Sequence, residues 1–179
     1  MLIEPLHEAR PFLQSISRQF PYVDYIVAAA AGKPGNVVLN VHPEMARTSE
    51  YWESDYAPGS VAPREVPAVT LDQVTHDRDL APPLLVKIDV QGAELEVLAG
   101  AEHTLEKTEC VVMETSLLEF FRGAPLAAEV VDYMNRHGFV IYDVWALQYR
   151  PHDGALTMLD IAFVKANGAF RSLHRSRPT

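Results

Sequence analysis

Apolar residues recur along the chain at two different spacings. In residues 7–20, 93–107 and 125–138 they return every three or four positions, which is typical of one buried face of an α-helix. Between these segments lie short runs that are apolar throughout or that alternate with polar residues, as β-strands do: residues 22–31, 36–42, 83–90, 110–116, 139–150 and 156–166. Helices and strands therefore alternate along the sequence.

This alternation predicts one α/β domain over residues 1–179. Because strands such as residues 84–88 are almost wholly apolar, we expect a mostly parallel sheet buried on both faces, which makes a three-layer sandwich. The last two strands are joined by PHDG at residues 151–154, a sequence typical of an antiparallel hairpin. We therefore expect this C-terminal hairpin to form one edge of the sheet.

Residues 43–67 break the pattern. They mix prolines, acids and aromatic residues with neither a helical nor a strand period. We expect a mobile loop here. Its aromatic residues, among them Tyr51, Trp52 and Tyr56, leave two interpretations: a lid over a substrate, or a small cluster that packs back on the domain.

Charge and composition exclude several classes of partner. The net charge is −9, with 24 acidic against 15 basic side chains. Nucleic acids and anionic membranes both require a basic surface, so we expect neither as a partner. The single cysteine, Cys110, rules out an internal disulfide, and no apolar run approaches the length of a membrane span. We also find no secretion leader, and these features together favour a cytoplasmic protein.

Three acids follow apolar strands at the point where each strand ends: Glu4, Asp89 and Glu114. In a parallel sheet the carboxyl ends of the strands form the ligand crevice, so we expect these side chains to converge there. Gly92 lets the chain turn closely past a ligand, and Glu94 falls in the first turn of the next helix, where the helix dipole favours an acid. The alternative is that each acid is only a helix cap or a solvated turn residue.

The block VKIDVQGAELEVLAGAEHTL resembles the signature of the FkbM-type methyltransferases, which use S-adenosylmethionine. The similarity extends to IEP near the start, to VTLDQV, and to VVMETS, HGFVIYDV and LDIAFV further along. The resemblance implies a class I methyltransferase fold, which is a Rossmann-like sheet with a reversed last strand. It also implies methyl transfer to a hydroxyl group of a small metabolite or sugar.

The same resemblance implies roles for particular residues. Glu4 would bond the ribose hydroxyls of the cofactor, and Asp89, Gln91 and Gly92 would line the cofactor site. Asp89 would be the first choice for the base that removes the hydroxyl proton.

Glu94 is the second choice for that base. Glu114 would contact the substrate, or a metal ion for which the sequence offers no complete set of ligands.

One departure from the family pattern stands out in this sequence. A first strand with a glycine-rich turn is expected about 20 residues before the ribose-binding acid, but only three residues precede Glu4 here. We therefore expect an N-terminally truncated domain that binds the cofactor weakly. Its strands would either pair directly across the gap or fill it by self-association, which makes a homo-oligomer a possible state.

Two other functions stay open at this point. The chain could be a degenerate, non-catalytic domain that binds a partner, which the missing glycine loop favours and the intact block from Asp89 to Glu94 disfavours. A nicotinamide-dependent oxidoreductase would share the fold class, but its glycine fingerprint is missing as well.

Overall fold

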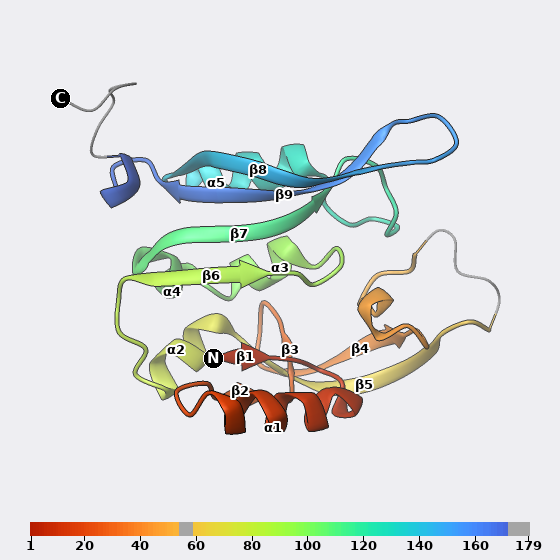
Figure 1. Ribbon diagram of the computed structural model, residues 1–179, viewed down its shortest axis with the longest axis horizontal. Helices are drawn as coiled ribbons and strands as arrows, with labels where there is room; N and C mark the ends of the chain where they lie inside the picture. The colour runs from red at the N-terminus through yellow and green to blue at the C-terminus, as the bar shows by residue number, and fades with distance from the viewer. Residues whose placement is uncertain (54–58, 172–179) are drawn as a thin grey trace.

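The computed structural model describes residues 1–53 and 59–171 as three small sheets and the helices around them (Figure 1). The largest sheet has the strand order β6-β7-β9-β8. Its strands are β6 (Leu84–Ile88), β7 (Thr108–Ser116), β8 (Phe139–Tyr149) and β9 (Leu156–Lys165). β6 and β7 are paired in parallel, and β9 is antiparallel to both of its neighbours, β7 and β8, so it alone is reversed in this sheet.

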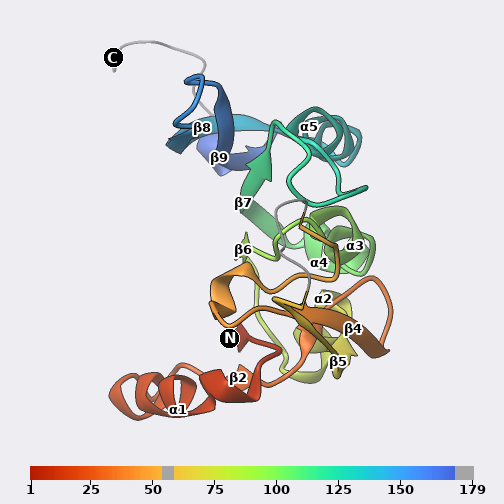
Figure 2. The ribbon, with the colours of Figure 1, turned by 90° about the vertical axis from the view of Figure 1, so that its right-hand side faces the viewer.

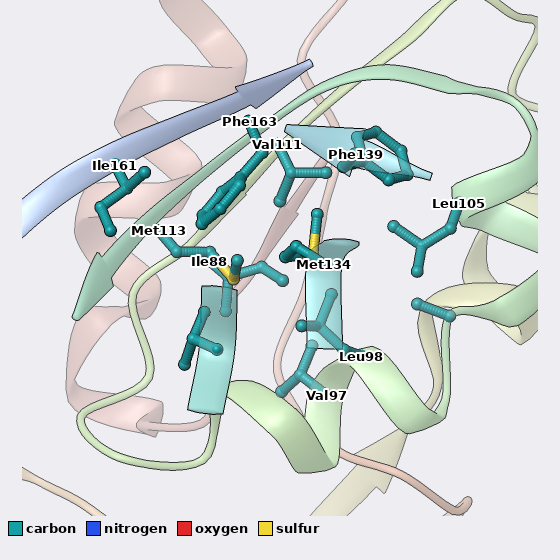
Figure 3. Packing of buried hydrophobic residues seen from close by; sticks show 12 residues of the cluster. Ile88, Val97, Leu98, Leu105, Val111, Met113, Met134, Phe139, Ile161 and Phe163 are labelled. Atoms are coloured by element: carbon teal, nitrogen blue, oxygen red, sulfur yellow. The ribbon is translucent and has the colours of Figure 1, made fainter. Parts of the chain in front are cut away.

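Three helices pack on one face of this sheet: α3 (Glu94–Ala99), α4 (Glu102–Glu106) and α5 (Ala127–Arg136), as Figure 2 shows. The apolar side chains that repeat every three or four positions on these helices meet the inward-facing side chains of the strands. The resulting core is drawn in Figure 3; it includes Ile88, Leu98, Val111, Met134, Phe139 and Phe163. The carboxyl ends of β6 and β7 are held in place by this packing.

The N-terminal part forms a separate pair of strands. β1 (Leu2–Ile3) lies parallel to β2 (Tyr25–Ile26), and the 3-10 helix η1 (His7–Ala9) and α1 (Arg10–Gln19) connect them. Of the residues in α1, only Leu13 is buried.

The third sheet is β3-β5-β4. β3 (Ala29–Ala30) pairs with the end of β5 (Ala62–Val69), and β4 (Gly35–Val41) runs antiparallel to β5 along its whole length. The short helix η2 (Met45–Arg47) follows β4, α2 (Leu71–Asp77) follows β5, and a last 3-10 turn closes the described chain at residues 169–171.

The expected single helix over residues 93–107 is interrupted at Gly100. A Cβ atom at that position would lie 2.5 Å from the carbonyl oxygen of Ala31, so the close approach of another segment requires glycine there. The second half, α4, then begins a new helix whose free N–H groups need acceptors. The carboxylate of Asp72 accepts from the backbone N–H of Thr104 at 2.7 Å and from that of His103 at 3.2 Å.

The expected strand over residues 22–31 is also divided into two. Its first part, β2, pairs with β1, whereas its second part, β3, pairs with β5 in a different sheet.

The expectation of a mostly parallel sheet with a C-terminal antiparallel hairpin, covered on both faces, holds only in part. In the largest sheet β6, β7 and β8 point the same way and β9 is reversed, so both antiparallel pairs are made by β9 and the sheet is mixed. The helices α3, α4 and α5 cover only one of its faces, and Leu85 on β6 is 69% exposed. The fold is therefore a mixed α/β arrangement.

The expected loop over residues 43–67 was also too long. Its last part is strand β5, which pairs with β4 from Ala62 onward. Pro63 and Pro67 argue against a strand when the sequence is considered alone. They are tolerated here because β3 pairs only with Ala68 and Val69, which leaves the earlier residues of β5 at an edge of the sheet. Trp52 lies within the described chain, whereas Tyr56 lies outside the described residues.

The described strands do not pair directly across the expected gap. β1 bonds only β2, and β6 bonds only β7, so each has one edge without a partner strand in this part of the chain. Closure by self-association stays a prediction.

Candidate functional site

A cavity of about 460 Å³ lies between β1 and the carboxyl ends of β6 and β7. It brings together Glu4 from the end of β1, Asp89 and Gln91 from the turn after β6, and Glu114 from β7. The size is within the range of about 300–1,000 Å³ typical of small-molecule sites. The three acids that follow strand ends in the sequence therefore line one cavity, as the convergence of strand ends predicts.

The side-chain amide of Gln91 bridges the two acids on the sheet side. Its Nε2 donates to Oδ1 of Asp89 at 3.1 Å and to Oε2 of Glu114 at 2.9 Å. The second oxygen of Asp89 accepts from Nζ of Lys87 at 2.7 Å, and the second oxygen of Glu114 accepts from the amide of Gln148 at 3.2 Å. Each carboxylate is thus oriented by two donors.

The turn that presents these groups has an unusual backbone. Gln91 has φ 54° and Gly92 has φ 102°, both in the left-handed region that L side chains seldom adopt. A Cβ at Gly92 would lie 2.9 Å from Cβ of Ala124, so glycine is required there for the backbone conformation and for space.

Glu94 sits behind the cavity rather than in its wall. It is 5% exposed, and its Oε1 accepts from the backbone N–H of Gly92 at 3.0 Å. Burial raises the pKa of Glu94 to about 7, and the bond from Gly92 opposes that rise. The lining of the cavity includes Asp89 and Glu114 but not Glu94. This geometry favours Asp89 over Glu94 as a group that touches a bound molecule.

Glu4 is positioned by the chain that follows it. Its Oε1 accepts from the backbone N–H of Leu6 at 2.8 Å. The backbone N–H of Glu4 donates to the carbonyl of Ile26 in β2, and the carbonyl of Glu4 accepts from the N–H of Ala28 just after it, both at 3.1 Å. One carboxylate oxygen is therefore engaged within the chain, and the side chain lies at the wall of the cavity.

Three residues of this region escaped the sequence reasoning: Ser49, Glu50 and Glu96. The first two lie in the aperiodic segment after β4, beside Tyr51, where no periodic signal indicates which side chains turn inward. Ser49 and Glu50 line the cavity, and the hydroxyl of Tyr51 donates to the carboxylate of Glu96 on α3. Part of the expected loop is therefore fastened beside the strand ends.

Charge in the cavity is uniformly acidic. Among the described residues, its lining contains four carboxylates, from Glu4, Glu50, Asp89 and Glu114, and neither lysine nor arginine. Burial raises the pKa of Glu114, as does the neighbouring Asp89. Burial also raises the pKa of Glu50, with a further contribution from Glu96. Such a cavity favours a ligand that carries positive charge.

The described residues contain no cluster of three or more histidine, cysteine, aspartate or glutamate side chains able to hold a metal ion. His42, His76 and His152 are absent from the lining of the cavity. Within the part of the chain that the structure describes, every helix is too short or too polar to cross a bilayer.

The family profile described as "Methyltransferase FkbM domain" matches residues 3–141. This span is more than three quarters of the 179 residues and contains all the cavity acids. The chain belongs to the FkbM methyltransferase family. Most of the C-terminal hairpin, from residue 142 onward, lies beyond the part that matches the FkbM profile. No curated protein and no solved structure matches the chain.

Proposed function

We propose that this FkbM domain transfers a methyl group from S-adenosylmethionine to a hydroxyl group of a small metabolite or sugar. The observation that carries the proposal is the acidic cavity, which is lined by Glu4, directly after β1, together with Asp89, Gln91 and Glu114 at the ends of β6 and β7. S-adenosylmethionine carries positive charge on a sulfonium bonded to its ribose and on the ammonium of its methionine part, which suits a wall of carboxylates.

The residues present fit both the ribose and the positively charged groups of such a cofactor. The carboxylate of Glu4 is suited to accept hydrogen bonds from ribose hydroxyls, because it is a strong acceptor with lone pairs to spare. Ile3, Leu6 and Leu39 add apolar surface to the same cavity. When bound, the cofactor supplies the electrophilic methyl group.

The chain's own part in the reaction is to position the acceptor and to take its proton. The carboxylate of Asp89 is held by Lys87 and Gln91 through one hydrogen bond on each oxygen. Each oxygen keeps lone pairs with which it can accept the proton of an acceptor hydroxyl. Asp89 is the proposed base, and Glu114, bridged to it by Gln91, is proposed to contact the acceptor.

Binding can be tested before any acceptor is known. Ligand-observed NMR detects weak binding, so we expect saturable signals from both S-adenosylmethionine and adenosine added to the chain. Glu4→Gln should weaken both ligands, whereas Asp89→Asn should weaken only S-adenosylmethionine, because adenosine has a ribose but no sulfonium.

Glu106→Gln is the matched control, since Glu106 is 74% exposed and lies away from the cavity. Absence of binding at millimolar S-adenosylmethionine would refute the cofactor assignment.

A second candidate function is partner binding without catalysis. It is favoured by exposed apolar side chains at this end of the molecule: Phe12 and Ile16, four residues apart on α1, and Phe20 directly after the helix. If S-adenosylmethionine fails to bind while a change at Phe12 alters association, this second function is supported instead.

A further inference from the structure

Ser49 lies 42 residues before Gln91 in the sequence but contacts it directly. Its Oγ is 2.5 Å from the carbonyl oxygen of Gln91, to which the hydroxyl donates. The same Oγ accepts from the backbone N–H of Tyr51 at 2.9 Å. Ser49 is 1% exposed, so its hydroxyl exchanges little with water and both bonds are well protected.

The segment that carries Ser49 is itself fixed at several points. The backbone N–H of Asn40 on β4 donates to the carbonyl of Ser49 at 2.8 Å, and the Asn40 side chain donates to the carbonyls of Glu50 and Tyr51. The bond from the Tyr51 hydroxyl to Glu96 ties the same segment to α3. Ser49 therefore reaches Gln91 from a rigid support.

The partner of Ser49 is a residue whose conformation needs support. Gln91 is a non-glycine residue with φ 54°, a conformation that costs of the order of 1 kcal/mol and persists only where neighbours hold it. In this backbone conformation the side-chain amide of Gln91 donates one hydrogen bond to Asp89 and one to Glu114. A small rotation of the turn would break both bonds.

We infer that Ser49 is a positioning residue: it holds the left-handed turn at Gln91 so that the Gln91 amide stays between Asp89 and Glu114. The segment before Trp52 and the acidic pair then act as one unit. Ser49 has its hydroxyl engaged by the chain on both sides and acts only through Gln91. That Asp89 and Glu114 take part in methyl transfer rests on the proposed function, whereas the link from Ser49 to the pair does not.

The pKa of the Glu114 carboxylate can report whether Ser49 holds Gln91 in place. A hydrogen bond from Gln91 lowers its pKa, against the larger upward effect of burial. Losing that bond should raise the pKa further. The other groups that face Glu114 are the charges of Asp89 and Lys87 at the end of β6, Asp160 on β9 and Glu94 on α3, and the amide of Gln148 on β8.

The test is a carboxyl titration of Glu114 followed by NMR on the labelled chain. In Ser49→Ala, and in Ser49→Cys, which keeps the side-chain volume but donates poorly, Glu114 should titrate at a higher pH than in the wild type. Ser49→Thr retains the hydroxyl and should restore the wild-type value. Thr108→Ala removes a buried hydroxyl at the other end of β7, which donates to Thr104 at 2.8 Å, and should leave the titration of Glu114 unchanged.

A double-mutant cycle shows whether Ser49 acts through Gln91. Gln91→Ala should raise the pKa of Glu114 by itself, and adding Ser49→Cys should then change nothing. An unchanged titration in folded Ser49→Cys, or a shift of equal size with and without the Gln91 side chain, would overturn the inference. Because the readout needs neither cofactor nor acceptor, failure of the proposed function would leave this result interpretable.

Discussion

The carboxylate of Glu94 accepts a hydrogen bond from the backbone N–H of Gly92, with 3.0 Å between Oε1 and the nitrogen. This bond closes the turn that carries Gln91, but the acid that makes it is buried. Burial raises its pKa from 4.5 to about 7, so the folded state keeps a proton that the unfolded state has already released. At pH values between 4.5 and about 7 the native state therefore binds more protons than the unfolded state. In this range the free energy of unfolding must fall as the pH rises.

We expect Glu94→Gln to remove this pH dependence. The amide oxygen can still accept from Gly92, but it carries no charge at any pH. At pH 8 the variant should be more stable than the wild type by up to about 3 kcal/mol, and near pH 4 the two should be similar. Urea unfolding at both pH values measures the difference, and the exposed Glu106→Gln should show no such gain at pH 8. A wild-type chain whose stability rises from pH 5 to pH 8 through Glu94 would contradict this.

Asp89→Asn should separate catalysis from stability. The side chain is exposed enough that Lys87 can turn to water when its partner becomes neutral. The free energy of unfolding should therefore change by less than about 1 kcal/mol. Methyl transfer to an accepted hydroxyl compound should slow on the order of 100-fold, because the base is lost. Asp132→Asn, in an exposed ion pair with Arg136, is the control; an unimpaired rate in Asp89→Asn would exclude Asp89 as the base.

Tyr51→Phe should loosen the segment beside the cavity. The lost hydroxyl is a donor to Glu96, whose other carboxylate oxygen is already buried without a hydrogen-bond partner among the described residues. We expect a loss of about 1–2 kcal/mol in stability and faster amide hydrogen exchange in residues 48–53. Mass spectrometry of exchanged peptides measures this. Tyr22→Phe, at a ring that is 83% exposed, should leave exchange in that segment unaltered.

Self-association should depend on the free edge of β6. Leu85 is 69% exposed on a strand that bonds only β7 in the described chain. Exposed apolar edges recruit other chains, and a lysine placed there opposes pairing. Sedimentation velocity over a range of concentrations should show association of the wild type and less of it in Leu85→Lys. A wild type that stays monomeric at high concentration would remove the basis of this prediction.

The positions of the cavity acids could be read from the sequence because one geometric rule covers them. Asp89 directly follows β6 and Glu114 lies near the end of the adjacent parallel strand β7, and such strand ends lie at one edge of a sheet. The core helices were predictable from the spacing of residues such as Leu98 and Met134. The break at Gly100 was not, because it depends on the approach of Ala31, which is distant in sequence.

The contributions of Ser49 and Glu94 could not be derived in the same way. Ser49 lies in a segment without a period, and its partner Gln91 is 42 residues away. Glu94 was correctly placed in the first turn of a helix, but the sequence does not state whether such a side chain faces solvent or folds back on Gly92. Contacts of this kind depend on backbone geometry rather than on hydrophobic pattern.

At two glycines the backbone of the N-terminal half packs directly against the backbone of the half that carries the large sheet. A Cβ at Gly32 would lie 2.9 Å from the carbonyl oxygen of Glu96, and a Cβ at Gly100 would lie 2.5 Å from that of Ala31. At this crossing the backbones touch without intervening side chains, which leaves almost no room for one half to slide over the other. Any opening of the cavity between Glu4 and Asp89 would therefore turn about Gly32 and Gly100 as a pivot. The clearance for a cofactor would be set by an angle at that pivot rather than by a distance along it.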